Sequence, residues 1–275
     1  MFFRAGRDKT EEPSLAAEDA RLWRESVEGF FFLEGLTEAE HRRLQGLAAL
    51  FLREKKLDPV GGLRLERPMA LQLAAQACLP LLHREWSWYD NWRTIILYPG
   101  EFLPDRWVAD EAGVLHRPGP HSGEAWPNGP IILSWDDVAA DLEDAADYPR
   151  NVAIHEICHQ LDVRSGGFDG VPELPREVGR GEWIETFNRA FKVFRKRLDK
   201  GRDTWMDPYG EESPAEFFAV ASETFFVDPW GLWEDFPEIY DLLTRYYRQD
   251  PKNRRPLEEN VPEGGPPPGD EFSWD

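Results

Sequence analysis

Apolar residues recur at helical spacing through the first part of the chain. Four of them share one stripe of a helix, at positions i, i+3, i+6 and i+7: Leu44, Leu47, Leu50 and Phe51. Thr37, with Glu40 three residues later, is typical of a capping box that opens this helix. We therefore predict helical structure over residues 15–57 and a second helix over residues 68–82, which are rich in Ala, Leu and Gln.

The pattern changes to β-branched and aromatic runs in the middle of the chain. Three such runs predict strands, at residues 92–98, 113–117 and 130–135. Pro99 and Gly100 end the first strand, and a Pro-Asn-Gly turn precedes the third. Because the connections between the runs are short, a sheet that they form must be mixed or antiparallel.

Helical spacing returns after Trp135 and continues almost to the end. Five segments predict helices: residues 136–145, 149–162, 181–199, 213–227 and 236–249. This order of elements indicates an α+β fold, mostly helical with one small sheet. We expect a single domain over residues 15–252, a flexible N-terminus at residues 1–14 and a flexible, acidic, Pro/Gly-rich tail at residues 253–275.

The composition is that of a globular protein and argues against some partners. Hydrophobic residues make up 41% of the chain, and 52 acidic against 32 basic side chains give a net charge of −20. A field of this sign repels phosphate backbones, so we expect no direct binding to nucleic acid. No apolar run approaches the roughly 18 residues that a membrane span needs, and the first residues lack the apolar stretch of a signal peptide. We therefore expect a cytoplasmic protein without membrane contact.

Residues 155–159, His-Glu-Ile-Cys-His, form an H-E-x-x-H motif within the second of these helices. Positions i and i+4 share one helix face, so the two imidazoles can bind one Zn²⁺ at about 2.0–2.1 Å. Pro149 would lie in the first turn of the helix. Glu156 can accept a proton from the attacking water and return it to the leaving amine. We predict one zinc ion per chain, bound by His155 and His159, with Glu156 as the catalytic base.

The remaining histidines and the cysteine inside the motif are not expected to bind the metal. Cys158 lies between the two ligands but toward the core, which indicates a buried, unreactive thiol. Four other histidines have no spacing that links them to the motif, and we expect structural or surface roles for them: His41, His83, His116 and His121.

A catalytic zinc site usually has a third protein ligand, and a carboxylate is a common choice. The elongated motif with a third histidine is excluded, because its glycine and histidine positions hold Asp162 and Ser165. Five acidic residues that follow the motif are possible on spacing alone: Asp169, Glu173, Glu177, Glu182 and Glu185.

Two further acidic residues, Glu216 and Glu223, share one face of the apolar helix at residues 213–227. They lie roughly 10.5 Å apart along the helix axis, so both cannot bind one ion. Glu216 is explained equally well as a ligand or as half of a capping box with Ser213. Glu223 is similarly open to a role as a hydrogen-bond acceptor behind the metal or as a partner in a buried ion pair.

Several segments of the chain resemble one family. N-V-A-I-H-E-I-C-H-Q-L-D at residues 151–162 and D-P-Y-G-x-x-S-P-A-E-F-F-A-V-x-S-E-x-F-F at residues 207–226 resemble the Mlc titration factor A family of glucose-regulated zinc metallopeptidases. G-E-A-W-x-x-G-P-I-I-L-S-W at residues 123–135 and Y-Y-R-Q-D-P at residues 246–251 resemble it as well. The resemblance extends over about residues 30–251, which is most of the chain.

The resemblance implies a zincin-like metallopeptidase of the gluzincin type, with the small sheet beside the active-site helix. It implies Glu216 as the third zinc ligand and Tyr209 as an active-site tyrosine. A phenol beside the metal could donate a hydrogen bond to the substrate oxyanion, whereas the residues around Tyr209 alone indicate only a turn. The resemblance further implies an aminopeptidase-like activity on short peptides and binding to a sugar-responsive DNA-binding repressor.

Two functions are compatible with these implications. The first is a peptidase that uses zinc and Glu156. The second is a protein that sequesters the repressor and whose zinc site is vestigial or structural. Glu156 favours the peptidase, because a structural site needs ligands but no general base.

The strand at residues 129–135 has two possible positions in the sheet. In zincins generally, a peptide substrate pairs with the edge strand of the sheet beside the active-site helix. The run Ile131-Ile132-Leu133 has few charges to protect an open edge, which would suit such a strand. The same run would equally suit a central strand that is buried on both faces.

Overall fold

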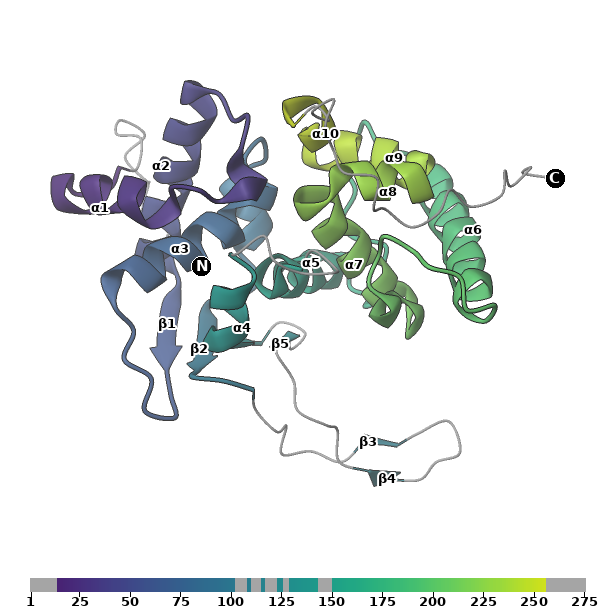
Figure 1. Ribbon diagram of the computed structural model, residues 1–275, viewed down its shortest axis with the longest axis horizontal. Helices are drawn as coiled ribbons and strands as arrows, with labels where there is room; N and C mark the ends of the chain where they lie inside the picture. The colour runs from purple at the N-terminus through teal and green to yellow at the C-terminus, as the bar shows by residue number, and fades with distance from the viewer. Residues whose placement is uncertain are drawn as a thin grey trace, which may run out of the picture.

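Helices form most of the described chain, and a small sheet lies beside them (Figure 1). The computed structural model describes residues 14–101, 108–109, 115–116, 123–125, 129–142 and 150–255. The helices are α1 (Ala17–Val27), α2 (Glu38–Glu54), α3 (Arg67–Cys78), α4 (Trp135–Ala140), α5 (Val152–Val163), α6 (Arg180–Leu198), α7 (Pro214–Val227), α8 (Pro229–Asp235), α9 (Pro237–Tyr247) and α10 (Pro251–Arg254). The strands are β1 (Lys56–Pro59), β2 (Thr94–Tyr98), β3 (Val108–Ala109), β4 (Leu115–His116), β5 (Gly123–Ala125) and β6 (Ile131–Ser134). The predicted α+β character is confirmed.

The predicted helical region at residues 15–57 contains two helices and the start of a strand. Gly29 and Gly35, with φ of 84° and 73°, lie between α1 and α2 and turn the chain in a conformation that glycine adopts without strain. The capping box is confirmed, since Glu40 Oε2 accepts from Thr37 N at 2.8 Å and Thr37 Oγ1 accepts from Glu40 N at 3.3 Å. Leu57 lies in β1, where pairing with β2 outweighs its helical spacing.

The later helices follow the predicted segments, with ends that differ by a few residues. α3, α5, α6, α7 and α9 are confirmed, and α4 covers the first part of its predicted range, of which residues 143–145 lie outside the described residues. α8 and α10 were not predicted. Prolines begin both helices at the first helical position. Asp228 separates α8 from α7, because its side chain accepts a hydrogen bond from Gly231 N at 3.0 Å.

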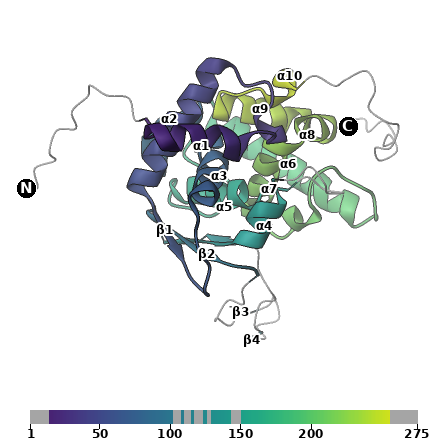
Figure 2. The same ribbon diagram turned by 60° about the vertical axis from the view of Figure 1, so that its left-hand side comes forward.

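The four-stranded sheet has the order β1-β2-β6-β5. β1, β2 and β6 run parallel, and β5 runs antiparallel to β6. The sheet is therefore mixed, which was one of the two predicted arrangements. β4, within the predicted strand at residues 113–117, is not part of this sheet. It pairs with β3 in a separate antiparallel ladder that lies away from the helices (Figure 2).

Strand β6 lies between β2 and β5, so the edge placement considered for residues 129–135 is wrong. Ile131 is paired with Ile95 on one side and with Ala125 on the other. Ile131 and Leu133 are buried. The apolar run therefore belongs to a central strand, and two neighbouring strands use its backbone hydrogen-bonding groups. β5, the last strand in the order, lies against α5.

Helices α5 and α7 pack against each other in the middle of the molecule (Figure 1). Every residue of α5 is buried, and so is every residue of α7 from Phe217 to Val227. α5 also contacts α3, β5 and β6, whereas α7 contacts α6, α8 and α9. The two helices are therefore held on several sides, and polar side chains that face each other between them have little freedom to move.

The expected start of the C-terminal tail at residue 253 falls within α10. Arg255 donates to Phe226 O at 2.8 Å, and Trp230 Nε1 donates to Arg255 O at 2.7 Å. These bonds hold the chain against α7 and α8 as far as residue 255. Residues 1–13 and 256–275 lie outside the described residues. No helix in the described ranges combines the length and the apolar character needed to cross a membrane.

Gly170 brings the loop after α5 into contact with the first turn of α7. Its φ is +75°, and a Cβ there would clash with the carbonyl oxygen of Pro214. Gly166 is a matched control, since its φ is +90° but no atom lies near the position of its Cβ. We expect Gly166→Ala to lower the free energy of unfolding by about 1–2 kcal/mol through backbone strain alone. Gly170→Ala should cost about 1–3 kcal/mol more, because of the added clash.

Urea unfolding followed by circular dichroism measures both losses. Equal losses for the two variants would contradict the close approach of Gly170 to Pro214.

Candidate metal centre

The helix that carries the H-E-x-x-H motif begins at Val152, later than predicted. Asn151 is its N-cap, and its Oδ1 accepts from Ile154 N at 2.9 Å. Pro149, which was expected in the first turn, lies outside the described residues. All of α5 is buried, so His155, Glu156 and His159 have relative exposures of only 8%, 5% and 4%. Polar groups buried to this degree need partners to offset the loss of water.

His155, His159 and Glu216 bring three potential ligand atoms to one place. Glu216 Oε2 lies 3.1 Å from His155 Nε2 and 3.1 Å from His159 Nε2. All three ligand atoms lie within 4.8 Å of one another. A tetrahedral zinc ion with bonds of about 2.0–2.2 Å separates its ligand atoms by roughly 3.3 Å. The two distances from Glu216 Oε2 are close to this value. This is the one group of its kind in the part of the chain that the structure describes.

The protonation of His155 indicates that a cation belongs between these atoms. Its Nδ1 lies 3.1 Å from Glu223 Oε2, and a carboxylate can only accept there, so Nδ1 carries a proton. In the neutral imidazole, Nε2 then presents a lone pair to Glu216 Oε2. Two lone pairs at 3.1 Å repel each other unless a proton or a metal ion lies between them. The donor set of this protein therefore fits a metal ion.

In the metal-free protein a proton fills part of this role. Burial opposes the charge on His155, but the Glu216 and Glu223 carboxylates outweigh burial and raise its pKa well above the usual value. Burial lowers the pKa of His159 despite its contact with Glu216. Burial also acts to raise the pKa of Glu216, but the two histidines reverse this effect and hold it well below the usual value. The carboxylate is therefore charged and ready to bind a cation.

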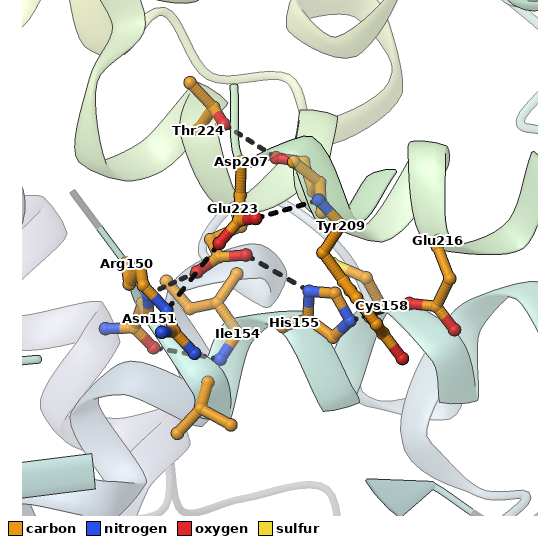
Figure 3. A network of polar contacts seen from close by, with 12 residues as sticks. Arg150, Asn151, Ile154, His155, Cys158, Asp207, Tyr209, Glu216, Glu223 and Thr224 are labelled. Atoms are coloured by element: carbon orange, nitrogen blue, oxygen red, sulfur yellow. Dashed lines mark hydrogen bonds and ion pairs between the residues drawn. The ribbon is translucent and has the colours of Figure 1, made fainter. Parts of the chain in front are cut away.

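The backbone N–H and the carboxylate of Glu216 have different partners. Ser213 Oγ accepts from Glu216 N at 3.1 Å, so Ser213 caps α7. The Glu216 carboxylate contacts His155 (Figure 3) and His159 instead of completing a capping box. The geometry thus favours Glu216 as the third ligand. The other acidic candidates lie elsewhere: Asp169 accepts from Val171 N, and four residues form ion pairs with arginines, namely Glu173, Glu177, Glu182 and Glu185.

Glu223 is a hydrogen-bond acceptor behind His155, one of the roles considered for it. Its Oε2 accepts from His155 Nδ1, and its Oε1 accepts from Asn151 N at 2.5 Å (Figure 3). One carboxylate therefore fixes both the orientation of a candidate ligand and the N-terminus of the helix that carries it. Such partners of metal-binding histidines also keep the metal-facing nitrogen unprotonated.

Tyr209 lies beside the three candidate ligands. It is part of the short 3₁₀ helix η4 (Pro208–Glu211), which packs against α7. Its ring centroid lies 6.2 Å from that of His155, and the side chain is 45% exposed (Figure 3). The predicted turn is present, since Asp207 Oδ1 accepts from Tyr209 N at 2.8 Å. Partial burial, together with the nearby Glu216 carboxylate, raises the pKa of the phenol. The hydroxyl therefore keeps the proton that a hydrogen-bond donor needs.

Two residues of the centre were missed by sequence reasoning. Gly123 of β5 faces Glu156, and a Cβ there would lie 2.5 Å from Glu156 Oε1. Phe168 has its ring centroid 4.9 Å from that of His159 and is 43% exposed. Gly123 lies inside the segment at residues 123–135 that carries the family resemblance, but only a three-dimensional contact reveals its neighbour. Phe168 has no pattern that distinguishes it from other loop residues.

The residues expected to lie outside the centre do so where the structure describes them. Cys158 is buried, its thiol lies 3.4 Å from Tyr247 Oη, and burial raises its pKa to about 12. The thiol is therefore protonated and unreactive. His83 contacts Glu40 at 2.9 Å, far from the motif in sequence. His121 and the side chain of His116 lie outside the described residues.

Comparisons with known proteins match most of the chain. Residues 5–248 match the family described as glucose-regulated metallo-peptidase M90. A Mlc titration factor A from Pectobacterium atrosepticum is 37% identical over 227 residues, which cover 81% of this chain and 84% of that protein. The Mlc titration factor A of Escherichia coli is 34% identical over 244 residues, which cover 87% of this chain and 90% of that protein. That of Yersinia pestis is 35% identical over 257 residues, which cover 92% of this chain and 93% of that protein. The resemblance identified from the motifs is confirmed.

The two roles of the 213–216 segment can be separated by substitution. We expect Glu216→Ala to bind far less than one metal ion per chain, because two imidazoles alone hold an ion weakly. Ser213→Ala should keep its metal and lose about 0.5–2 kcal/mol of stability, since it removes only the cap. Metal analysis by mass spectrometry and urea unfolding measure the two effects. Full metal occupancy in Glu216→Ala would rule Glu216 out as a ligand.

Proposed function

Because the chain belongs to the family of glucose-regulated metallo-peptidases M90, we propose that it is a zinc-dependent peptidase with a zincin-like fold of the gluzincin type. We propose an aminopeptidase-like activity on short peptides. The observation that carries this proposal is the convergence of His155, His159 and Glu216 beside a buried glutamate and an exposed phenol.

The donor set supports zinc over the other common divalent ions. His155 and His159 would supply nitrogen ligands and Glu216 an oxygen ligand. Mg²⁺ and Ca²⁺ prefer sites made of oxygen ligands, whereas two imidazoles and one carboxylate are a usual set for catalytic zinc. When bound, the ion would act as a Lewis acid that polarises water and the substrate carbonyl.

Glu156 is proposed as the general base. It lies on α5 next to His155, and its side chain is 5% exposed, between the helix and β5. From this position the carboxylate would take the proton from the attacking water and then return it to the leaving amine. The close backbone of β5 limits the space that Glu156 can occupy, which would favour one orientation of the carboxylate.

Tyr209 is proposed to stabilise the oxyanion. Its side chain is 45% exposed beside His155, so a substrate that approaches from solvent can meet the phenol. A raised pKa keeps the hydroxyl protonated at neutral pH. The proton can then be donated to the oxygen on which negative charge develops in the transition state.

Strand β5 is the better candidate for pairing with a substrate, in place of β6. It is the last strand in the order of the sheet and lies against the helix that carries Glu156. An extended peptide could add to it as a further strand, and main-chain hydrogen bonds would then position the scissile bond near α5.

A second candidate function comes from the name of the relatives, Mlc titration factor A. By similarity, we propose that this chain binds a counterpart of Mlc, expected to be a sugar-responsive DNA-binding repressor. Such a partner would place the chain in the cytoplasm. The net charge of −20 disfavours contact with DNA itself and is compatible with binding the repressor. A protein that only sequesters the repressor would need neither Glu156 nor an exposed Tyr209 beside the metal, so we prefer the peptidase.

The role of Glu156 can be tested directly. Glu156→Gln is nearly isosteric but cannot accept a proton, so we expect kcat to fall by roughly 10²–10⁴ with zinc content unchanged. Cleavage of a panel of chromogenic aminoacyl and peptide substrates, beside metal analysis, provides the measurement. His159→Ala is the comparison that should lose both zinc and activity. Substantial turnover by Glu156→Gln would mean that the base lies elsewhere.

The contact between Gly123 and Glu156 gives a second test of the same assignment. Gly123→Ala should displace the Glu156 carboxylate and lower kcat on the order of 10- to 100-fold without loss of zinc. Gly181→Ala is the control, because no atom lies near its Cβ position. Glu156→Asp removes the closest contact, that with Oε1, but keeps a γ-carbon, and Val152 Cγ2 also lies 2.8 Å from the Cβ position. Adding Gly123→Ala to Glu156→Asp should therefore cost less than adding it to the wild type. Purely additive losses would show that Gly123 does not act through Glu156.

A further inference from the structure

Two exposed aromatic side chains flank the two candidate histidine ligands. Only three large apolar or aromatic residues of the described chain are classed as exposed: Phe168, Tyr209 and Trp233. Tyr209 lies beside His155, and Phe168 lies against His159 with an angle of 31° between the rings. Each candidate histidine ligand therefore has an exposed ring next to it: His155 a phenol, for which a role is proposed above, and His159 a phenyl ring to which no role has been assigned.

Trp233, although exposed, packs against side chains of its own chain. The Lys252 ammonium lies 4.1 Å from its ring centroid, and Trp230 packs edge-on at 6.0 Å. Its faces are therefore used by neighbours of the same chain. The ring of Phe168 packs instead against His159, a candidate metal ligand. The exposed part of the phenyl ring is thus available next to the place where a substrate must bind.

The loop that carries Phe168 is held at Gly170, two residues later. The loop is bound to α5, because Gly170 N donates to Asp162 Oδ2 at 2.8 Å. It is bound to α6, because Trp183 Nε1 donates to Gly170 O at 2.9 Å. Gly170 also lies directly against the carbonyl of Pro214, two residues before Glu216. The exposure of Phe168 is therefore a feature of an anchored loop.

When a ligand covers an exposed apolar ring, the free energy of the complex falls, because apolar surface is removed from water. Burial of a side chain against Phe168 would remove apolar surface of both partners from water, and an aromatic partner adds a favourable ring-to-ring contact. A charged side chain would lose hydration there without gaining a hydrogen bond. The position next to His159 places this contact beside the scissile bond.

Resting on the peptidase function proposed above, we propose that Phe168 forms one wall of the substrate cleft and determines specificity. It selects peptides in which a residue adjoining the scissile bond has an apolar side chain, above all an aromatic one. The alternative is that the ring only shields His159 from water, in which case its loss would weaken metal binding and leave selectivity unchanged.

The test compares peptides that are identical except for Phe, Leu, Ser or Glu at a position adjoining the scissile bond, on either side. We expect the wild type to prefer the Phe and Leu peptides in kcat/KM. Phe168→Ala should reduce the preference for Phe over Ser by about tenfold, with zinc content unchanged. Phe168→Leu should retain most of the preference. Trp233→Ala, which removes an exposed ring away from the metal centre, should behave as the wild type.

A binding measurement separates this inference from the peptidase proposal. Zinc-loaded Glu156→Gln is titrated with the same peptides by calorimetry, with and without Phe168→Ala. Tighter binding of the Phe peptide that disappears with Phe168→Ala supports the cleft even if no variant cleaves any peptide, in which case only the peptidase proposal fails. Equal affinity of the Phe and Ser peptides, no binding of either, or loss of zinc as the sole effect of Phe168→Ala would overturn the inference.

Discussion

The contact of one carboxylate oxygen with two imidazole nitrogens, all within a nearly buried layer between α5 and α7, constrains much of the rest of the molecule. Glu216 Oε2 faces His155 Nε2 and His159 Nε2 at the same distance of 3.1 Å. Lone pairs in this arrangement repel one another unless a cation lies among them, and burial removes the water that could otherwise separate them. A metal ion among the three atoms would remove this repulsion.

Contacts made by three residues, Glu223, Gly170 and Gly123, position the side chains of this layer. Glu223 orients His155 and also accepts from the backbone of the N-cap residue, so a ligand and the start of its helix depend on one carboxylate. Gly170 lets the loop after α5 approach the first turn of α7, where Glu216 lies. Gly123 lets β5 approach Glu156. Each of these contacts brings together two elements that carry the proposed chemistry, and neither glycine would tolerate a larger side chain without movement.

The sequence indicates more about the candidate metal-binding residues than about the order of the strands in the sheet. The spacing of His155 and His159 fixes their common face on any helix, so their convergence follows from helix geometry alone. The sequence could not decide between cap and ligand for Glu216, because its N–H donates to the capping Ser213 while its carboxylate is free to face the two histidines. Only the packing of α7 against α5, which brings Glu216 close to His155, shows where that carboxylate points.

The sheet was harder because its strands are short. β1 and β5 contain four and three residues, too few to show a period of two, and both include charged residues. β6 is a central strand only because β5 pairs with it, and the sequence does not reveal β5. The apolar run at residues 131–133 could therefore not be assigned to an edge strand or to a central strand. Gly123 matters through a contact with Glu156, 33 residues later, and Phe168 through the way its loop folds back onto His159, and no local pattern predicts either contact.

The most direct test of the metal centre is anomalous X-ray diffraction at the zinc absorption edge, from crystals of protein purified without chelators and supplied with zinc. We expect one strong peak per chain, about 2.0–2.2 Å from His155 Nε2, His159 Nε2 and a carboxylate oxygen of Glu216. The absence of a peak between these three side chains, or a single peak bound by other residues, would contradict the account.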